Sequence, residues 1–262
     1  MIHTEPYGDV RRLELSTRRS RVIRMSVSTY VVRDVLIDSG FAAIGASLEE
    51  RLASEPLRGV LITHRHEDHA GNVERLARRG LPLGMSRHTD EALRAPHRIA
   101  LYRRYTWGTP PPLRSVTPSF DDAELQLLAA PGHSSDHHVV WDAREGTLFS
   151  GDLFLGVKVP IAHASERPRE LVRSLRMAIS LGPARMFDAH RGPVPRPLSA
   201  LEAKVAWLED VIGQVEVLMA RGWSQSSIQR TLLGREGLPG LLSVGEYSKR
   251  NLVTAILEER DA

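Results

Sequence analysis

A run of histidine and aspartate directly after an apolar segment is the feature that most restricts how this chain can fold. Residues 59–63 form an apolar run of the kind found in the buried strands of a layered sheet. Within the next six positions come His64, His66, Asp68 and His69. A loop that leaves a strand end can direct such side chains to one point, whereas a helix would distribute them around its axis. Because imidazole and carboxylate bind zinc and other divalent first-row metals, the sequence predicts a metal site at the edge of a sheet.

Three more potential ligands each follow another predicted strand. His133 comes after the strand predicted at 125–129, Asp152 after 147–149, and His190 after 185–187. Loops that leave strands at one edge of a sheet converge there. We therefore expect these three residues to join the four of the first cluster in a single site of seven ligands.

The order of predicted elements indicates an α/β fold followed by a helical segment. Strands are predicted at 21–32, 35–37, 59–63, 125–129, 139–142, 147–149 and 185–187, and helices at 73–79 and 169–181. The four prolines between 108 and 119 predict a stiff loop. From residue 198 onward, apolar residues recur at helical spacing, and Pro193, Pro195 and Pro197 precede them. We expect one domain over residues 1–195 and a helical subdomain over 198–262.

Composition excludes several classes of protein. The chain has no cysteine, which rules out a disulfide framework, a thiolate metal site and a cysteine nucleophile. Its net charge of +3 is too small to predict nucleic-acid binding by itself. Residues 1–12 lack the apolar core of a secretory signal, and no apolar run approaches the ~20 residues of a membrane span. The expectation is a cytoplasmic protein without a membrane partner.

With these motifs, the chain resembles the metallo-β-lactamase superfamily over roughly residues 20–195, and its dinuclear metallo-hydrolases in particular. The resemblance begins at Asp38 and continues through the seven candidate ligands in the family's order. It implies an αβ/βα sandwich with a C-terminal helical tail, for which a winged-helix form is one alternative. The glyoxalase II group and the β-lactamase-like endoribonuclease group are the most similar branches.

The resemblance also implies a role for each candidate residue. One metal would take His64, His66 and His133, the other would take Asp68, His69 and His190, and Asp152 would bridge both. The cofactor implied is two zinc ions per chain, with manganese or iron as alternatives. Asp38 would orient the ligand loop without touching metal, and His137 would pack beside the ligands. Asp68 is the candidate catalytic residue, as a proton carrier, and His163 is a candidate contact of the substrate.

The function implied is hydrolysis by a hydroxide held between the two metals, which would attack an ester, thioester, lactone or phosphodiester. A small-molecule substrate fits this reading, and RNA is an alternative partner. The second hypothesis is a single-strand endoribonuclease, favoured by Asp136 within segment 131–137 and by the helical tail. The third is a persulfide dioxygenase with a single iron ion. Oligomeric state, native metal and substrate identity are left open by the sequence.

Residues 93–107 are rich in arginine and aromatic side chains and allow two interpretations. One is an amphipathic helix with Ile99, Leu101 and Tyr105 packed inward and its arginines in solvent. The other is a lip of the substrate site, where arginine meets phosphate and an aromatic ring stacks on a base.

Overall fold

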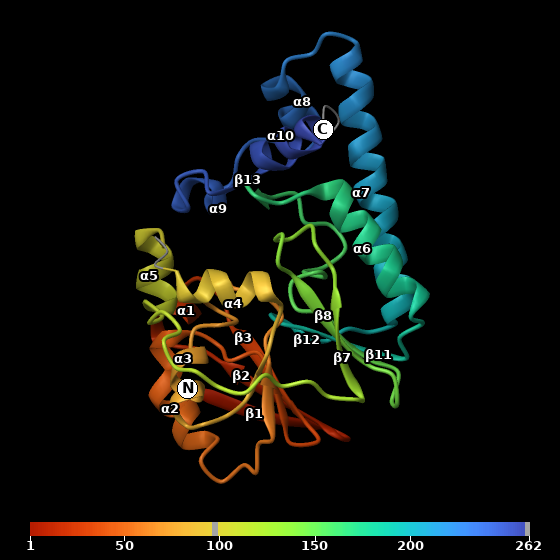
Figure 1. Ribbon diagram of the computed structural model, residues 1–262. Helices are drawn as coiled ribbons and strands as arrows, with labels where there is room; N and C mark the ends of the chain where they lie inside the picture. Colours follow the sequence, from red (N-terminus) through yellow and green to blue (C-terminus); the bar gives the residue numbers. More distant parts are fainter. Residues whose placement is uncertain (96–98, 260–262) are drawn as a thin grey trace.

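Two β-sheets face each other at the centre of the molecule, and helices cover the outer face of each (Figure 1). The computed structural model describes residues 1–95 and 99–259 of the 262-residue chain. The first sheet has the strand order β1-β2-β3-β4-β5-β6. Its strands are β1 Ile2–Tyr7, β2 Val10–Leu15, β3 Val27–Val32, β4 Val35–Ile37, β5 Gly59–Leu61 and β6 Leu83–Gly84.

The second sheet has the order β12-β11-β9-β8-β7. Its strands are β7 Leu125–Ala129, β8 His138–Asp142, β9 Thr147–Phe149, β11 Arg185–Asp188 and β12 Gly192–Pro193. Strand β8 is antiparallel to both β7 and β9, and β9 is parallel to β11. The carboxyl ends of β7, β9 and β11 therefore lie at the same edge of this sheet.

Alternation along β3 shows how one strand serves two cores. Tyr30 and Val32 point into the layer between the sheets, where Tyr30 packs against Phe149 and Phe187 of the opposite sheet. Val27 and Val31 point the other way, into the core beneath the helices. Both faces of the strand are buried, as expected where helices cover the outside of a sandwich.

Helices complete the outer layers. The first sheet is covered by the 3₁₀ turn η1 Ala42–Ile44 and by α2 Gly45–Arg51, α3 Val73–Arg78, α4 Arg87–Arg94 and α5 Leu101–Trp107. The second is covered by α6 Pro168–Ser180 and by α7 Pro197–Ala220. These layers confirm the predicted αβ/βα sandwich. Among the described residues, no helix has both the length and the apolar character that a membrane crossing requires.

The predicted C-terminal helices are present. After α7 follow α8 Gln225–Leu232, α9 Leu238–Leu242, the short strand β13 Tyr247–Ser248 and α10 Lys249–Glu258. Strand β13 pairs with β10 Ala162–His163, and in the described part of the tail it is the single strand, so a wing hairpin within these residues is not formed.

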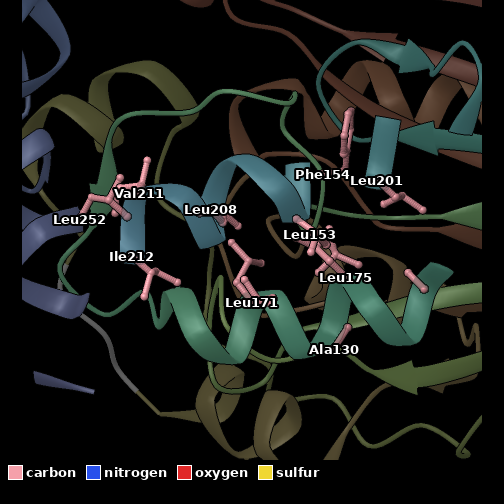
Figure 2. Close-up of a cluster of buried hydrophobic side chains, with 14 of the residues drawn as sticks. Ala130, Leu153, Phe154, Leu171, Leu175, Leu201, Leu208, Val211, Ile212 and Leu252 are labelled. Atoms are coloured by element: carbon pink, nitrogen blue, oxygen red, sulfur yellow. The ribbon is translucent and has the colours of Figure 1, made fainter. Parts of the chain in front are cut away.

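One hydrophobic core joins the tail to the sandwich. Leu171 and Leu175 of α6 pack in the same cluster as Leu208 and Ile212 of α7 and Leu252 of α10 (Figure 2). Because this core includes residues on both sides of position 195, a division into separate units at 1–195 and 198–262 stays a prediction.

Two parts of the N-terminal region differ from the sequence-based expectation. The strand predicted at 21–32 is wrong over its first six residues, because α1 Arg18–Val22 begins in a capping box formed by Thr17 and Ser20. Strands β1 and β2 were not predicted, because the charged residues of segment 1–15 obscure the alternation of buried and exposed side chains. Arg12 is one of these charged residues, and it is buried against Ser28 and Glu5.

The proline-rich loop is irregular as predicted, and a buried carboxylate fixes it. Glu74 of α3 accepts hydrogen bonds from the backbone N–H groups of Arg114 (2.8 Å) and Ser115 (3.0 Å). Burial opposes ionisation of Glu74, but these bonds together with Arg78 outweigh it and lower the pKa of the carboxyl. The loop is therefore held against the first sheet's helices.

Candidate metal centre

The seven candidate ligands lie together where four strands end. His64, His66, Asp68 and His69 follow β5, His133 follows β7, Asp152 follows β9 and His190 follows β11. They form two groups, His64 with His66, His133 and Asp152, and Asp68 with His69 and His190. Within each group the donor atoms lie within 4.8 Å of one another. This is the division that the resemblance implies, and metal binding by each residue stays a prediction.

Asp152 lies between the two groups. Its Oδ1 is 3.3 Å from Nε2 of His69 and 3.3 Å from Nε2 of His190. Its Oδ2 is 3.4 Å from Nε2 of His133. One carboxylate thus faces both groups, which is the position that a bridging ligand requires.

Hydrogen bonds on the outer side of the rings orient the histidines. His69 Nδ1 is 2.8 Å from Asp38 Oδ2, and His190 Nδ1 is 2.9 Å from the carbonyl oxygen of Ser26. His64 Nδ1 lies 3.0 Å from Thr63 Oγ1. A partner on Nδ1 leaves Nε2 with a lone pair toward the site, the arrangement typical of metal-binding histidines.

His133 has an acidic neighbour that sequence reasoning missed. Glu166 Oε1 lies 3.5 Å from His133 Nδ1, while His133 Nε2 lies 3.0 Å from His66 Nδ1. Glu166 belongs to the loop before α6, which carries none of the seven candidate ligands. Ser26 was missed for the same reason, because neither residue has a local motif that points to the site.

Several atoms that face the site are suited to bind a cation. His64 Nε2, His69 Nε2 and Asp152 Oδ1 are buried and have no hydrogen-bond partner in the described part of the chain. Buried polar atoms of native proteins are nearly always satisfied. Because these atoms belong to nitrogen and oxygen donors that divalent first-row metals prefer, the residues fit a metal centre.

The candidate ligands differ in protonation when no metal is bound. Burial lowers the pKa of His64 and of His66 well below the ordinary histidine value, so both rings are neutral near pH 7. Burial opposes ionisation of Asp152, but the adjacent His69 and His190 outweigh it and hold the pKa of its carboxyl well below the usual range. Neutral imidazole and ionised carboxylate are the forms that bind a metal. At His69, His133 and His190 burial opposes a charge on the ring, but adjacent carboxylates outweigh it and raise the pKa, to about 9 for His190, so metal binding would displace a proton there.

His137 positions Asp152 from behind. Its Nε2 accepts a hydrogen bond from the Asp152 backbone N–H at 3.0 Å, and its Nδ1 lies 3.1 Å from the carbonyl oxygen of Ala130. Burial lowers the pKa of His137 to about 3, so the ring is neutral and can accept this bond. The structure places His137 beside the candidate ligand Asp152 and outside both groups, and its role at a metal centre stays a prediction.

His163 lies at the rim of the site. Its ring centroid is 6.4 Å from that of His66, and its Nε2 is 3.3 Å from Glu246 Oε1. Contact with a substrate stays a prediction for this residue.

Segment 93–107 differs from the predicted amphipathic helix. Residues 96–98, which include His97 and Arg98, lie outside the described residues. Within α5, Leu101 and Tyr105 are exposed. Arg103 is turned inward instead and forms two hydrogen bonds, of 2.5 and 2.6 Å, with the carboxylate of Glu67. The arginines of this segment are thus not all in solvent, and Arg103 contacts the loop that carries the ligands.

The sequence matches a known family over most of the sandwich. Residues 22–190, more than half of the chain, match the family model described as Metallo-beta-lactamase superfamily. The chain belongs to the metallo-β-lactamase superfamily.

Two curated relatives match a longer stretch of this chain than the family model does. The chain is 28% identical to the "Beta-lactamase-like protein 2 homolog" of Drosophila melanogaster over 207 residues, which are 72% of this chain and 66% of that protein. It is 32% identical to the "Atrochrysone carboxyl ACP thioesterase" of Aspergillus fumigatus over 211 residues, which are 73% of this chain and 45% of that protein. The matches thus span about two thirds or less of these relatives' own lengths.

A solved structure shares the fold of nearly the whole chain. The "Beta-lactamase domain protein" from Burkholderia ambifaria aligns with a TM-score of 0.70 at 19% identity, and the alignment covers 97% of this chain and 88% of that one. The helical tail therefore belongs to the part of the fold that this structure has in common.

Replacing Asp38 by asparagine is expected to weaken metal binding by roughly 10- to 100-fold, the usual effect of losing the carboxylate behind a metal-binding histidine. The reason is that Asp38 Oδ2 faces His69 Nδ1 while Asp38 Oδ1 accepts from the Thr63 backbone N–H. Competition with a chromogenic chelator measures the affinity. Asp90→Asn, at a partly buried carboxylate of α4 that pairs with Arg94, is the matched control. An unchanged affinity in the Asp38 variant would contradict this role.

Proposed function

We propose that the protein is a dinuclear zinc-dependent hydrolase that cleaves an ester or thioester bond at its carbonyl carbon. The observation that carries the proposal is the position of Asp152, with oxygens 3.3–3.4 Å from one histidine of the first ligand group and two of the second. Cleavage of a lactone or a phosphodiester uses the same arrangement of ligands. Within this wider class of hydrolysis reactions, we favour cleavage of an ester or thioester.

Zinc at such a site supplies a Lewis acid and a water molecule of lowered pKa. The chain's own residues bind the ions, orient the ligands and transfer the proton. Asp152, Asp68 and the five histidines would hold the two ions. Asp38 and His137 fix the orientation of His69 and Asp152. Asp68, whose Oδ2 lies 3.8 Å from His190 Nε2, is the carboxylate to which we assign proton transfer to the leaving group.

A relative and the charge distribution support the choice of a carbonyl. One curated relative is named as a thioesterase. RNA cleavage would favour a continuous positive path to the metals. In the described part of segment 93–107, Arg94 is instead paired with Asp90, and Arg103 with Glu67 and Glu246. The charges of these two arginines are largely balanced, so we rank endonuclease activity second.

Metal content per chain tests the proposal first. Protein purified without added metal or chelator is expected to contain about two zinc ions per chain by plasma mass spectrometry, as a dinuclear hydrolase requires. A panel of thioesters, esters, lactones, phosphodiesters and single-stranded RNA then follows. Hydrolysis confined to RNA would favour the endoribonuclease. About one iron per chain with oxygen uptake on a persulfide would favour the dioxygenase and contradict the proposal.

A further inference from the structure

The C-terminal tail brings a tyrosine to the rim of the metal centre. Tyr247 lies in β13, which pairs with β10 so that Tyr247 is opposite His163. The two rings are 5.2 Å apart between centroids, and the His163 ring is in turn 6.4 Å from the ring of His66. In Figure 1, β13 lies between α9 and α10, next to the green segment that precedes α6. Tyr247 is therefore one ring removed from a candidate ligand.

Buried ion pairs hold this part of the tail in place. Arg103 of α5 binds Glu67, which stands between His66 and Asp68, and also binds Glu246 at 3.1 Å. The guanidinium carbon of Arg103 lies 5.9 Å from the centroid of the Tyr247 ring. The ligand loop, α5 and the tail are thus joined at one guanidinium, which fixes the position of Tyr247 relative to the metals.

The Tyr247 hydroxyl is available to a substrate. Its backbone N–H and carbonyl oxygen are both bonded to Ser243 Oγ, whereas no described residue forms a hydrogen bond with the hydroxyl. In the described part of the chain, the hydroxyl is not among the unpaired polar atoms that solvent cannot reach. It therefore borders open space.

The phenol is a donor near neutral pH. Burial raises its pKa well above the ordinary tyrosine value, and the carboxylates of Asp68, Glu166 and Glu67 raise it further against the opposing effect of Arg103. Those carboxylates belong to, or border, the two ligand groups. A protonated phenol with no partner beside a metal centre can donate to an oxygen atom of a bound molecule.

We propose that Tyr247 is a substrate-contacting residue, whose hydroxyl donates a hydrogen bond to the oxygen of the scissile carbonyl as negative charge develops on it. This inference rests on the proposed ester or thioester hydrolysis. It assigns to the tail a direct part in the reaction, because a donor aimed at a developing oxyanion lowers the barrier more than it tightens substrate binding.

Tyr247→Phe tests the proposal with little disturbance, since the ring that packs on His163 and Arg103 is retained. We expect the variant to keep its zinc content and to lose about 100-fold in kcat/KM on the best thioester or ester of the panel, mostly in kcat. Tyr105→Phe, on the exposed side of α5, is the matched control and should stay within about twofold of the wild type. A Tyr247→Phe variant with full zinc and wild-type kcat would overturn the proposal.

A second readout separates this inference from the proposed function. A phosphonate analogue of an acyl ester carries the charge of the reacting carbonyl without being cleaved, and calorimetry measures its binding to the zinc-loaded protein. We expect Tyr247→Phe to bind the phosphonate about tenfold more weakly than the wild type, the loss of one hydrogen bond to a charged oxygen. If Tyr247→Phe binds the phosphonate more weakly but the wild type cleaves no ester or thioester, only the proposed function would be rejected. Equal binding by both proteins would reject the role of Tyr247.

Discussion

Asp152→Asn is expected to lower the rate of hydrolysis at least ~100-fold and to release about one of two zinc ions per chain, while the protein stays folded. The carboxylate faces His69, His190 and His133 at 3.3–3.4 Å, so a neutral amide would remove the one anionic group shared by the two ligand groups. Its backbone N–H would still donate to His137, which keeps the loop in place. Activity and metal content of the same preparation measure the effect.

Two comparisons make this result specific. Asp210→Asn, on the exposed face of α7, changes the net charge equally and should retain both metals and full activity. Circular dichroism of the Asp152 variant should match that of the wild type. If the variant kept two zinc ions and normal turnover, Asp152 would not bridge the centre and the dinuclear assignment would fail.

The clustering of the candidate ligands could be predicted from the sequence because their spacing is set locally. Each candidate follows a strand, and β7, β9 and β11 run in the same direction. Residues that are far apart in the sequence therefore lie close together in the structure. The sandwich was predictable for the same reason. Its buried strands are short apolar runs that end at turns.

The residues around the ligands were not predictable in this way. Ser26, Glu166, Arg103 and Glu246 reach the site from segments that carry no metal-binding motif, and only the packing of the sheets and tail brings them there. Arg103 shows the difficulty most clearly. An arginine in a basic, aromatic segment is typical of a solvated helix face, yet this one has a buried carboxylate within reach and turns inward.

The ion pair of Arg103 leads to the largest stability change that we expect. Arg103→Met should destabilise the protein by about 3 kcal/mol, because removing one partner of a buried pair leaves the other charge uncompensated. The side chains of Arg103 and Glu67 are 12% and 4% exposed, and Glu67 stands beside Asp68, a second carboxylate. The melting temperature at fixed zinc concentration should fall by roughly 6–12 °C for a chain of this size.

Neighbouring substitutions establish whether that loss belongs to the pair. Arg104→Met, one position further along α5, removes an exposed arginine and should change stability by less than about 0.5 kcal/mol. Adding Glu67→Gln to Arg103→Met removes the uncompensated charge and should restore part of the lost stability, as a double-mutant cycle measures. If Glu67→Gln destabilised the Arg103→Met protein as much as it destabilises the wild type, the two residues would act independently.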